Sequence, residues 1–174
     1  LEDILDILKV ARPPDVTINW EPPPKPVYMT VNPGRFQQLV MNLCLNAFHA
    51  MPDGGELKII LGQHNAPVHI NADADGNDDE GEYGDNIDDE YGGFSGKIIL
   101  EIIDTGTGIP EEYLEKIFDP LYTTKPGEKG TGLGLFVVRQ IVDDYDGSIH
   151  VLSKPGKGTR FIIIFRAENG GVGE

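Results

Sequence analysis

The order of helical and strand-like patterns along the chain is the strongest constraint on its fold. Apolar residues recur at helical spacing in residues 1–9, 34–51 and 134–145. Short apolar runs predict strands over residues 16–20, 27–31, 57–61, 97–103, 148–153 and 159–165. Strands that follow one another without an intervening helix favour an antiparallel or mixed sheet. We therefore predict an α/β fold of the α+β type, a two-layer sandwich in which a mixed, mostly antiparallel sheet packs against helices.

The 174 residues have the length of one domain. Residues 1–10 resemble the end of a helix that is entered midway, because no capping residue precedes Leu1. Residues 11–166 hold the remaining predicted helices and strands, and residues 167–174 form a tail. Residues 63–96 are rich in Gly, Asp and Asn and are long for a loop, so we interpret them as an acidic insertion between two adjacent strands.

The net charge of −15 is concentrated in this insertion. Residues 73–90 contain 10 acidic side chains and no Lys or Arg, whereas the rest of the chain has 14 basic and 19 acidic side chains, a net charge of −5. Without a basic patch, we expect no nucleic-acid partner. No apolar run approaches the roughly 20 residues of a membrane span, so we expect no direct membrane contact. The single cysteine, Cys44, excludes an internal disulfide and lies in an apolar helical pattern typical of a core residue. A cytoplasmic setting fits these features.

Part of the insertion, residues 71–82, nearly matches a twelve-residue calcium loop. The ligand or turn positions are held by Asp73, Asp75, Gly76 and Glu82. The first position is Asn instead of Asp, the eighth is Asp where an apolar residue is expected, and no flanking helix pair is evident. These departures favour a solvated low-complexity loop over a calcium site.

A polar stripe lies beside the apolar stripe of the helix predicted over residues 34–51. Asn42, Asn46 and His49 are spaced by four and three residues, so their side chains share one helix face. An amide oxygen can coordinate Mg²⁺, which prefers oxygen ligands. Taken alone, two asparagines on a helix are more often surface or capping residues.

Further segments combine glycines with polar side chains. Directly after an apolar strand comes 104-DTGTGIP-110, where a carboxylate could accept a hydrogen bond from an exocyclic amine and glycines let a flat ring approach the backbone. Two later segments are 117-IFDPLYTTK-125 and 130-GTGLGL-135. The latter opens a helix, where exposed backbone N–H groups and the helix dipole favour phosphate. Each segment is a weak signal by itself.

Together and in this order, the four segments resemble the N, G1, F and G2 boxes of the catalytic ATP-binding domain of sensor histidine kinases. That domain belongs to the GHKL superfamily, shared with gyrase, the Hsp90 chaperones and the mismatch-repair ATPases. The resemblance runs from about Leu1 to Arg166 and is interrupted only by the acidic insertion. It implies the Bergerat fold, with a mobile ATP lid over roughly residues 106–132.

Carried over by position, the resemblance implies that Asn46 is the Mg²⁺ ligand that holds the ATP phosphates, and that Asn42 supports the same network. His49 lies where many relatives place a basic side chain against a phosphate, although a solvated histidine is equally expected. Lys125 and Lys129 flank the lid and could reach phosphate or be merely solvated. The hinge and phosphate-binding turn of the lid are implied for Gly130, Thr131, Gly132, Leu133 and Gly134.

At the base end, the resemblance implies that Asp104 reads the adenine amino group. Gly106 and Gly108 would shape the adenine wall, with Ile109 as an apolar neighbour. Thr159 matches the hydroxyl that often joins this carboxylate near the base, usually through water.

The function implied is phosphoryl transfer. The hydrolytic branches of the superfamily carry Glu where this chain has Asn42, and an amide cannot act as a general base. The family's phosphoacceptor histidine motif is missing, which implies that residues 1–10 end a linker from a separate dimerisation domain. We therefore expect a monomeric chain that binds Mg-ATP without phosphorylating itself.

The γ-phosphate would be presented to a histidine of that helical domain and passed on to a response-regulator receiver domain. The alternatives are a GHKL-type ATPase with an unusual base, a nucleotide-binding pseudokinase module, and a relative that acts on Ser or Thr.

Overall fold

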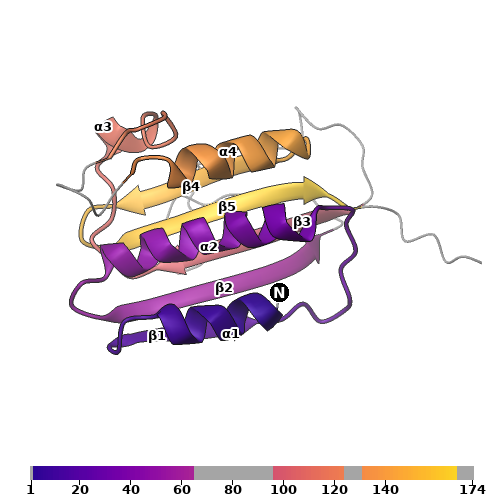
Figure 1. Ribbon diagram of the computed structural model, residues 1–174, viewed down its shortest axis with the longest axis horizontal. Helices are drawn as coiled ribbons and strands as arrows, with labels where there is room; N and C mark the ends of the chain where they lie inside the picture. The colour runs from indigo at the N-terminus through magenta and orange to yellow at the C-terminus, as the bar shows by residue number, and fades with distance from the viewer. Residues whose placement is uncertain (1, 65–95, 124–130, 168–174) are drawn as a thin grey trace, which may run out of the picture.

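The computed structural model describes residues 2–64, 96–123 and 131–167. Figure 1 shows the elements, which follow the chain as α1 (Glu2–Ala11), β1 (Val16–Glu21), α2 (Pro33–Ala50), β2 (Gly55–His64), β3 (Lys97–Asp104), α3 (Glu111–Leu114), α4 (Gly134–Asp144), β4 (Ser148–Lys154) and β5 (Gly158–Arg166). The resemblance to a calcium loop in residues 71–82 lies outside the described residues.

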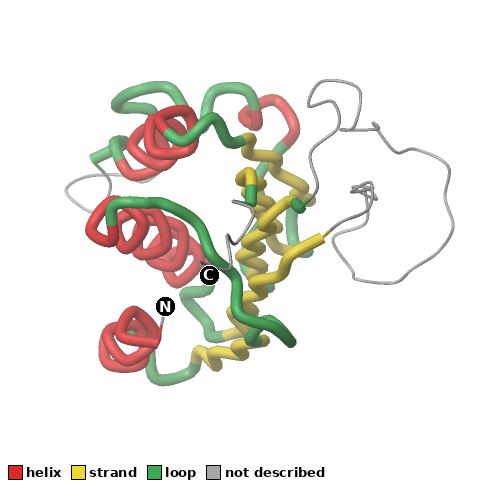
Figure 2. The backbone as a smooth tube through the Cα atoms, turned by 90° about the vertical axis from the view of Figure 1, so that its right-hand side faces the viewer, coloured by secondary structure: helices red, strands yellow, loops and turns green. Residues whose placement is uncertain are grey.

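The strands form one sheet in the order β1-β2-β3-β5-β4. β1 pairs with β2 in parallel, and every other neighbouring pair is antiparallel. The view in Figure 2 shows the longer helices α1, α2 and α4 on one side of the sheet, while the short α3 lies near β4 at its end. The predicted two-layer sandwich with a mixed, mostly antiparallel sheet is therefore confirmed.

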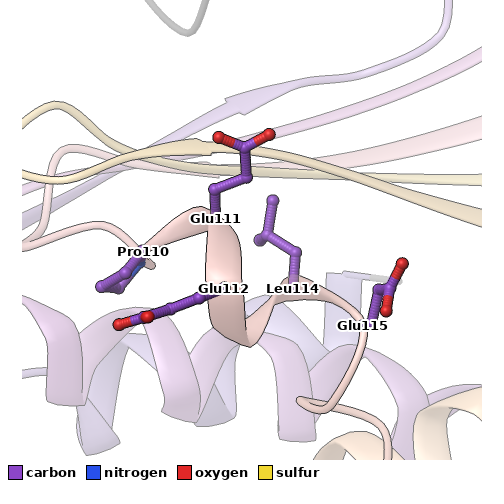
Figure 3. A pocket seen from close by; sticks show the side chains of 5 residues that line it. All are labelled: Pro110, Glu111, Glu112, Leu114 and Glu115. Carbon is purple, nitrogen blue, oxygen red and sulfur yellow. The ribbon is translucent and has the colours of Figure 1, made fainter.

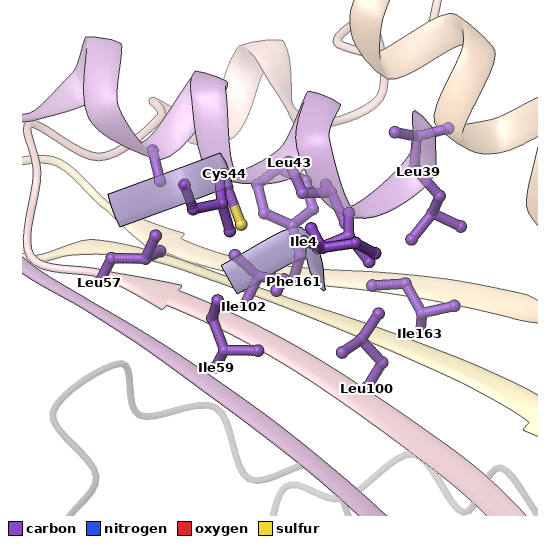
Figure 4. Close-up of a cluster of buried hydrophobic side chains, with 14 of the residues drawn as sticks. Ile4, Leu39, Leu43, Cys44, Leu57, Ile59, Leu100, Ile102, Phe161 and Ile163 are labelled. Carbon is purple, nitrogen blue, oxygen red and sulfur yellow. The ribbon is translucent and has the colours of Figure 1, made fainter. Parts of the chain in front are cut away.

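Helix α2 lies over the middle of the sheet and builds the core. Its apolar side chains point down onto β2, β3 and β5, as Figure 4 shows for Leu39, Leu43 and Cys44. The helix begins at Pro33 because the side chain of Asn32 accepts hydrogen bonds from the backbone N–H groups of Gly34 and Arg35. This core fixes the face of α2 that is left for polar side chains.

Helix α4 packs antiparallel beside α2. The backbone N–H of Asn32, at the start of α2, donates a 2.9 Å hydrogen bond to the hydroxyl of Tyr145, at the end of α4. Arg35 and Asp144 form an ion pair at the same end. These contacts hold the start of α2 against the end of α4. The N-terminus of α4 therefore lies beside the later turns of α2, which carry the polar stripe.

One local prediction is wrong, and one short helix lies where none was predicted. Residues 27–31 form no strand, because Pro22, Pro23, Pro24 and Pro26 remove backbone donors around them and β1 ends the sheet without a further neighbour. Val27 and Met29 instead pack against the core. The short helix α3 was not expected, since four residues are too few to show a helical period.

Candidate functional site

A row of three polar side chains crosses the sheet at the end of β3. Asp104 pairs in register with Thr159 of β5, which pairs in turn with Ser153 of β4. On its other side Asp104 pairs with Leu57, a residue of the helix-facing core, so the row faces the helices. Asp104 is only 4 % exposed and Thr159 only 3 %. Buried polar side chains at a strand end indicate a functional site or a structural network.

The electrostatics of this row are set by the burial of Asp104. Burial raises the pKa of this carboxyl to about 6, although hydrogen bonds from the backbone N–H groups of Gly106 and Thr159 lower it in part. The Gly106 N–H lies 2.9 Å from the Asp104 Oδ1. At neutral pH the carboxylate is therefore ionised and can only accept hydrogen bonds.

The loop that follows Asp104 is fixed between the end of α2 and the turn before β5. The Thr107 N–H donates to the Ala50 carbonyl at 2.9 Å, and the Gly156 N–H donates to the Thr107 carbonyl at 2.8 Å. The Ile109 N–H donates to the Ser153 hydroxyl at 2.8 Å. The first of these bonds also satisfies a carbonyl at the end of α2 that has no partner within the helix.

The glycines of this loop are required by contacts within the protein. A Cβ on Gly106 would lie 2.6 Å from the Ala50 carbonyl oxygen, and one on Gly108, whose φ is +70°, would lie 2.1 Å from the Lys154 carbonyl oxygen. No side chain fits at either distance. These glycines therefore allow the loop to pack closely against the ends of α2 and β4. Their role in shaping the wall of an adenine site stays a prediction.

The polar stripe of α2 faces the N-terminus of α4. A methyl group placed on the Cα of Gly134, the first residue of α4, would lie 3.8 Å from the Asn42 Oδ1 and 3.8 Å from the Asn46 Nδ2. The N-cap residue of α4, Leu133, gives no side-chain hydrogen bond to the first turn. Two amides thus stand opposite a helix end whose N–H groups favour an anion.

The two ends of the segment before α4 are joined by a backbone contact. The Leu121 N–H donates to the Gly132 carbonyl at 3.0 Å, and both residues have a left-handed backbone, with φ values of +66° and +65°. The Thr131 hydroxyl accepts from the Leu133 N–H at 3.4 Å. Lys125, Lys129 and Gly130 lie outside the described residues, so their predicted roles stay predictions.

Two further residues predicted from the sequence, His49 and Ile109, lie within the described part of the chain. His49 is exposed in the last turn of α2. Ile109 is half-buried and packs against the core. Sequence reasoning missed Ser153, which contacts both Ile109 and Thr159. The available signal was the short turn between β4 and β5, which places these two strands in register as a hairpin.

An open hollow of about 790 Å³ beside α3 does not coincide with these residues. It is lined by Pro110, Glu111, Glu112, Leu114 and Glu115. Figure 3 shows the three carboxylates pointing in different directions, so they do not converge on one ligand. Their negative charge would repel a phosphate, and we do not place the site there.

No helix within the described residues is long and apolar enough to cross a membrane. The same part of the chain holds no cluster of three or more His, Cys, Asp and Glu side chains that could bind a metal ion.

Comparison with known proteins decides the family. A family model described as histidine kinase-, DNA gyrase B-, and HSP90-like ATPase matches residues 31–169. The chain belongs to this family. The matched range of this ATPase-family domain contains the polar stripe of α2, the row at Asp104 and the N-terminus of α4. The resemblance found in the sequence is confirmed, and nucleotide binding is the activity that family membership supports.

Curated relatives of this ATPase-family domain are sensor and sporulation kinases. Sensor kinase CckA of Brucella abortus (strain 2308) is 44 % identical over 130 residues, which cover 75 % of this chain and 12 % of that protein. Sporulation kinase A of Bacillus subtilis (strain 168) is 37 % identical over 139 residues, which cover 80 % of this chain and 18 % of that protein. The chain thus spans less than a fifth of the length of either relative.

Solved structures of histidine kinases share the fold. The mycobacterial sensor histidine kinase MprB superposes with a TM-score of 0.66 at 22 % identity, covering 96 % of this chain and 91 % of that one. The nucleotide-free catalytic domain of histidine kinase ThkA gives a TM-score of 0.64 at 24 % identity, covering 95 % and 91 %.

Proposed function

We propose that this chain is the ATP-binding catalytic domain of a two-component sensor histidine kinase. The observation that carries the proposal is the position of Gly134, at the start of α4, against Asn42 and Asn46 of α2. It gives one end of the site the groups that a triphosphate and its cation need, while the row at Asp104 gives the other end an acceptor for a base. The kinase names of the relatives support the same reaction class.

At the base end, the ionised Asp104 would accept a hydrogen bond from the exocyclic amine of adenine. Its low exposure strengthens this contact, because few waters compete for the carboxylate. The loop from Gly106 to Ile109 would lie along the ring, held in place by Ala50 and Ser153.

At the phosphate end, the N–H groups of the first turn of α4 would bind phosphate oxygens, and the helix dipole favours their charge. The Asn46 side-chain oxygen fits the donor type that Mg²⁺ prefers, with Asn42 one turn earlier in the same network. Mg²⁺, when bound with the triphosphate, neutralises charge that develops on the γ-phosphate. Lys125, His49 and the residues from Gly130 to Leu133 are proposed to border the phosphates.

The reaction proposed is transfer and not hydrolysis. Asn42 stands one turn before Asn46, and its amide cannot take a proton from water. The domain would hold the γ-phosphate in line for attack by a histidine nitrogen of a separate helical domain. The bond from the γ-phosphorus to that nitrogen forms as the bond to the β-γ bridging oxygen breaks and ADP leaves. The phosphoryl group would then pass to a response-regulator receiver domain.

The wider setting follows from the same proposal. Helix α1 (Glu2–Ala11) would be the end of the linker from the histidine-bearing dimerisation domain. The chain by itself would be a monomer and would act in the cytoplasm, without nucleic acid and without direct membrane contact.

The test is transfer between separate molecules. The chain is incubated with Mg²⁺ and γ-labelled ATP, alone and with a purified histidine-bearing helical domain, and a His→Gln variant of that domain serves as the control. We expect label on the histidine domain only, with negligible phosphate release. Steady phosphate release by the chain alone, lost in Asn42→Ala, would identify an ATPase instead. Binding of ATP without transfer to any histidine domain would indicate a nucleotide-binding pseudokinase module.

A further inference from the structure

We infer that Ser153 is a positioning residue that makes the Thr159 hydroxyl a hydrogen-bond acceptor, so that the base end of the site selects a purine with an amino group at position 6 over one with an oxo group. The inference rests on the proposed function, since it assigns base selection to the same site. Ser153 lies on the edge strand β4 and belongs to none of the motif segments of the sequence.

The Ser153 hydroxyl has three hydrogen-bonding partners within the described residues. Its Oγ lies 2.8 Å from the Ile109 backbone nitrogen, 2.9 Å from the Gly158 carbonyl oxygen and 2.9 Å from the Thr159 Oγ1. A serine hydroxyl has one hydrogen to donate and two lone pairs that accept. The Ile109 N–H can only donate, and the Gly158 carbonyl can only accept.

One assignment of hydrogens satisfies all three contacts. The hydrogen of Ser153 goes to the Gly158 carbonyl, one lone pair accepts from Ile109, and the other must accept from the Thr159 hydroxyl. If the hydrogen pointed to Thr159 instead, the Ser153 and Gly158 oxygens would face each other at 2.9 Å without a hydrogen between them. The backbone around Ser153 thus fixes the direction of the neighbouring hydroxyl.

Thr159 therefore has no hydrogen left for a ligand. Its hydroxyl oxygen keeps a lone pair, and Asp104, its register partner on β3, is also an acceptor at neutral pH. Two adjacent acceptors match an exocyclic amine, which donates two hydrogens directly or through water. A 6-oxo group would bring a third acceptor to the same place and leave buried lone pairs without donors.

The geometry is rigid enough to enforce this choice. Gly158 has a φ of +99°, and a Cβ there would lie 1.9 Å from the Asp104 carbonyl oxygen, so its backbone is fixed against β3. Ser153 pairs with Thr159 in register, and Thr159 is almost fully buried. The strand pairing therefore keeps the Gly158 carbonyl and the Thr159 side chain beside Ser153.

The test compares the affinity for Mg-ATP with that for Mg-ITP, which carries the 6-oxo group, by calorimetry on the wild type and on Ser153→Ala. We expect the wild type to prefer ATP. In Ser153→Ala the Thr159 hydrogen is released and can donate to the oxo group, so the ATP-to-ITP preference should fall by about five- to tenfold. Ser148→Ala is the matched control, because Ser148 lies on the same strand and its hydroxyl contacts His150 instead.

The preference ratio separates a positioning role from a purely structural one. If Ser153 only held the loop at Ile109, the affinities of Ser153→Ala for Mg-ATP and Mg-ITP would fall by the same factor. An unchanged ATP-to-ITP ratio would therefore overturn the inference. Where Ser153→Ala does not fold, Ser153→Thr and Ser153→Val replace it, a pair with nearly the same shape of which only Thr keeps the hydroxyl; equal ratios in the two would contradict the inference. Failure of the wild type to bind either nucleotide would instead contradict the proposed function, and the inference with it.

Discussion

Gly134 at the first position of α4 faces Asn46 on α2, and a methyl group on its Cα would lie 3.8 Å from the Asn46 Nδ2. The two residues are 88 positions apart in the chain and meet because α2 and α4 pack antiparallel. The space beside Gly134 is thus bounded by a helix N-terminus on one side and by amides on the other. We propose that the phosphates bind in this space.

Gly134→Ala should separate folding from binding. Its Cβ would make only ordinary contacts within the protein, and alanine loses less chain entropy on folding, so stability should be unchanged or higher by up to about 1 kcal/mol. The methyl group would occupy the proposed phosphate space, and Mg-ATP affinity should fall about tenfold or more. Calorimetry and urea unfolding measure the two effects. Gly34→Ala, in the first turn of α2 and away from the site, is the control for affinity alone, because its Cβ would lie 3.3 Å from the Asn32 Oδ1 that caps the helix. Equal affinity in both variants would contradict the placement.

Asp104→Asn should raise stability at neutral pH while it weakens ATP binding. Burial raises the carboxyl pKa from 3.8 to about 6, so the folded state binds the proton more tightly than the unfolded state does. Between about pH 4 and pH 6 this group therefore lowers stability as pH rises, by up to about 3 kcal/mol in total. The neutral amide avoids that penalty, so the variant should be the more stable protein by about 1–3 kcal/mol at pH 7.5.

The pH dependence supplies the control for this variant. The stability gap between Asp104→Asn and the wild type should narrow as pH falls from about 7 to 4, because the wild-type carboxyl takes up its proton in that window. Urea unfolding at several pH values measures it. A gap that does not change with pH would show that this carboxyl has an ordinary pKa in the folded protein.

Substitution by alanine should cost different amounts of stability at two glycines that have similar backbone angles. Gly108 and Gly156 have φ values of +70° and +77°, but a Cβ on Gly108 would lie 2.1 Å from the Lys154 carbonyl oxygen, whereas one on Gly156 would meet nothing within 4 Å. Gly156→Ala should cost about 1–2 kcal/mol for the left-handed backbone alone. Gly108→Ala should cost about 2 kcal/mol more, because the loop must move away from β4. Equal losses in thermal or urea unfolding would show that the contact is not tight.

Cys44 should be inert in the folded protein. Its side chain lies on α2, fully buried against the sheet, and burial raises the pKa of the thiol to about 12. The reactive thiolate is therefore almost absent at neutral pH. Ellman's reagent should react only as fast as the protein unfolds and at once in concentrated urea. Rapid reaction without denaturant would mean that α2 opens readily from the sheet.

The sequence predicted the elements whose burial leaves a periodic pattern. Helix α2 shows a helical period because one of its faces packs in the core, and β3 and β5 are apolar runs because both of their faces are buried. Residues 27–31 form a similar apolar run but pair with no strand of the described sheet, and a local pattern does not show whether a partner strand exists. Helix α3 is too short for a period.

The candidate site residues that lie within the sequence motifs could be predicted from the sequence. Asn42, Asn46 and Asp104 stand out by type and spacing, and the structure brings the two asparagines to Gly134. The contact of Gly106 with Ala50 depends on how the loop packs against α2, which spacing does not encode. Ser153 was missed because its importance comes from its register with Thr159 and from the Gly158 carbonyl.

The most direct test of the central claim is a calorimetric titration of Mg-ATP into the wild type, Asp104→Ala and Asn46→Ala, with phosphate release followed in the same samples. The account predicts micromolar binding by the wild type, on the order of −8 kcal/mol, with both variants weaker and turnover negligible. Tight binding that neither substitution changes would contradict the proposed site, and rapid turnover by the wild type would contradict the kinase assignment.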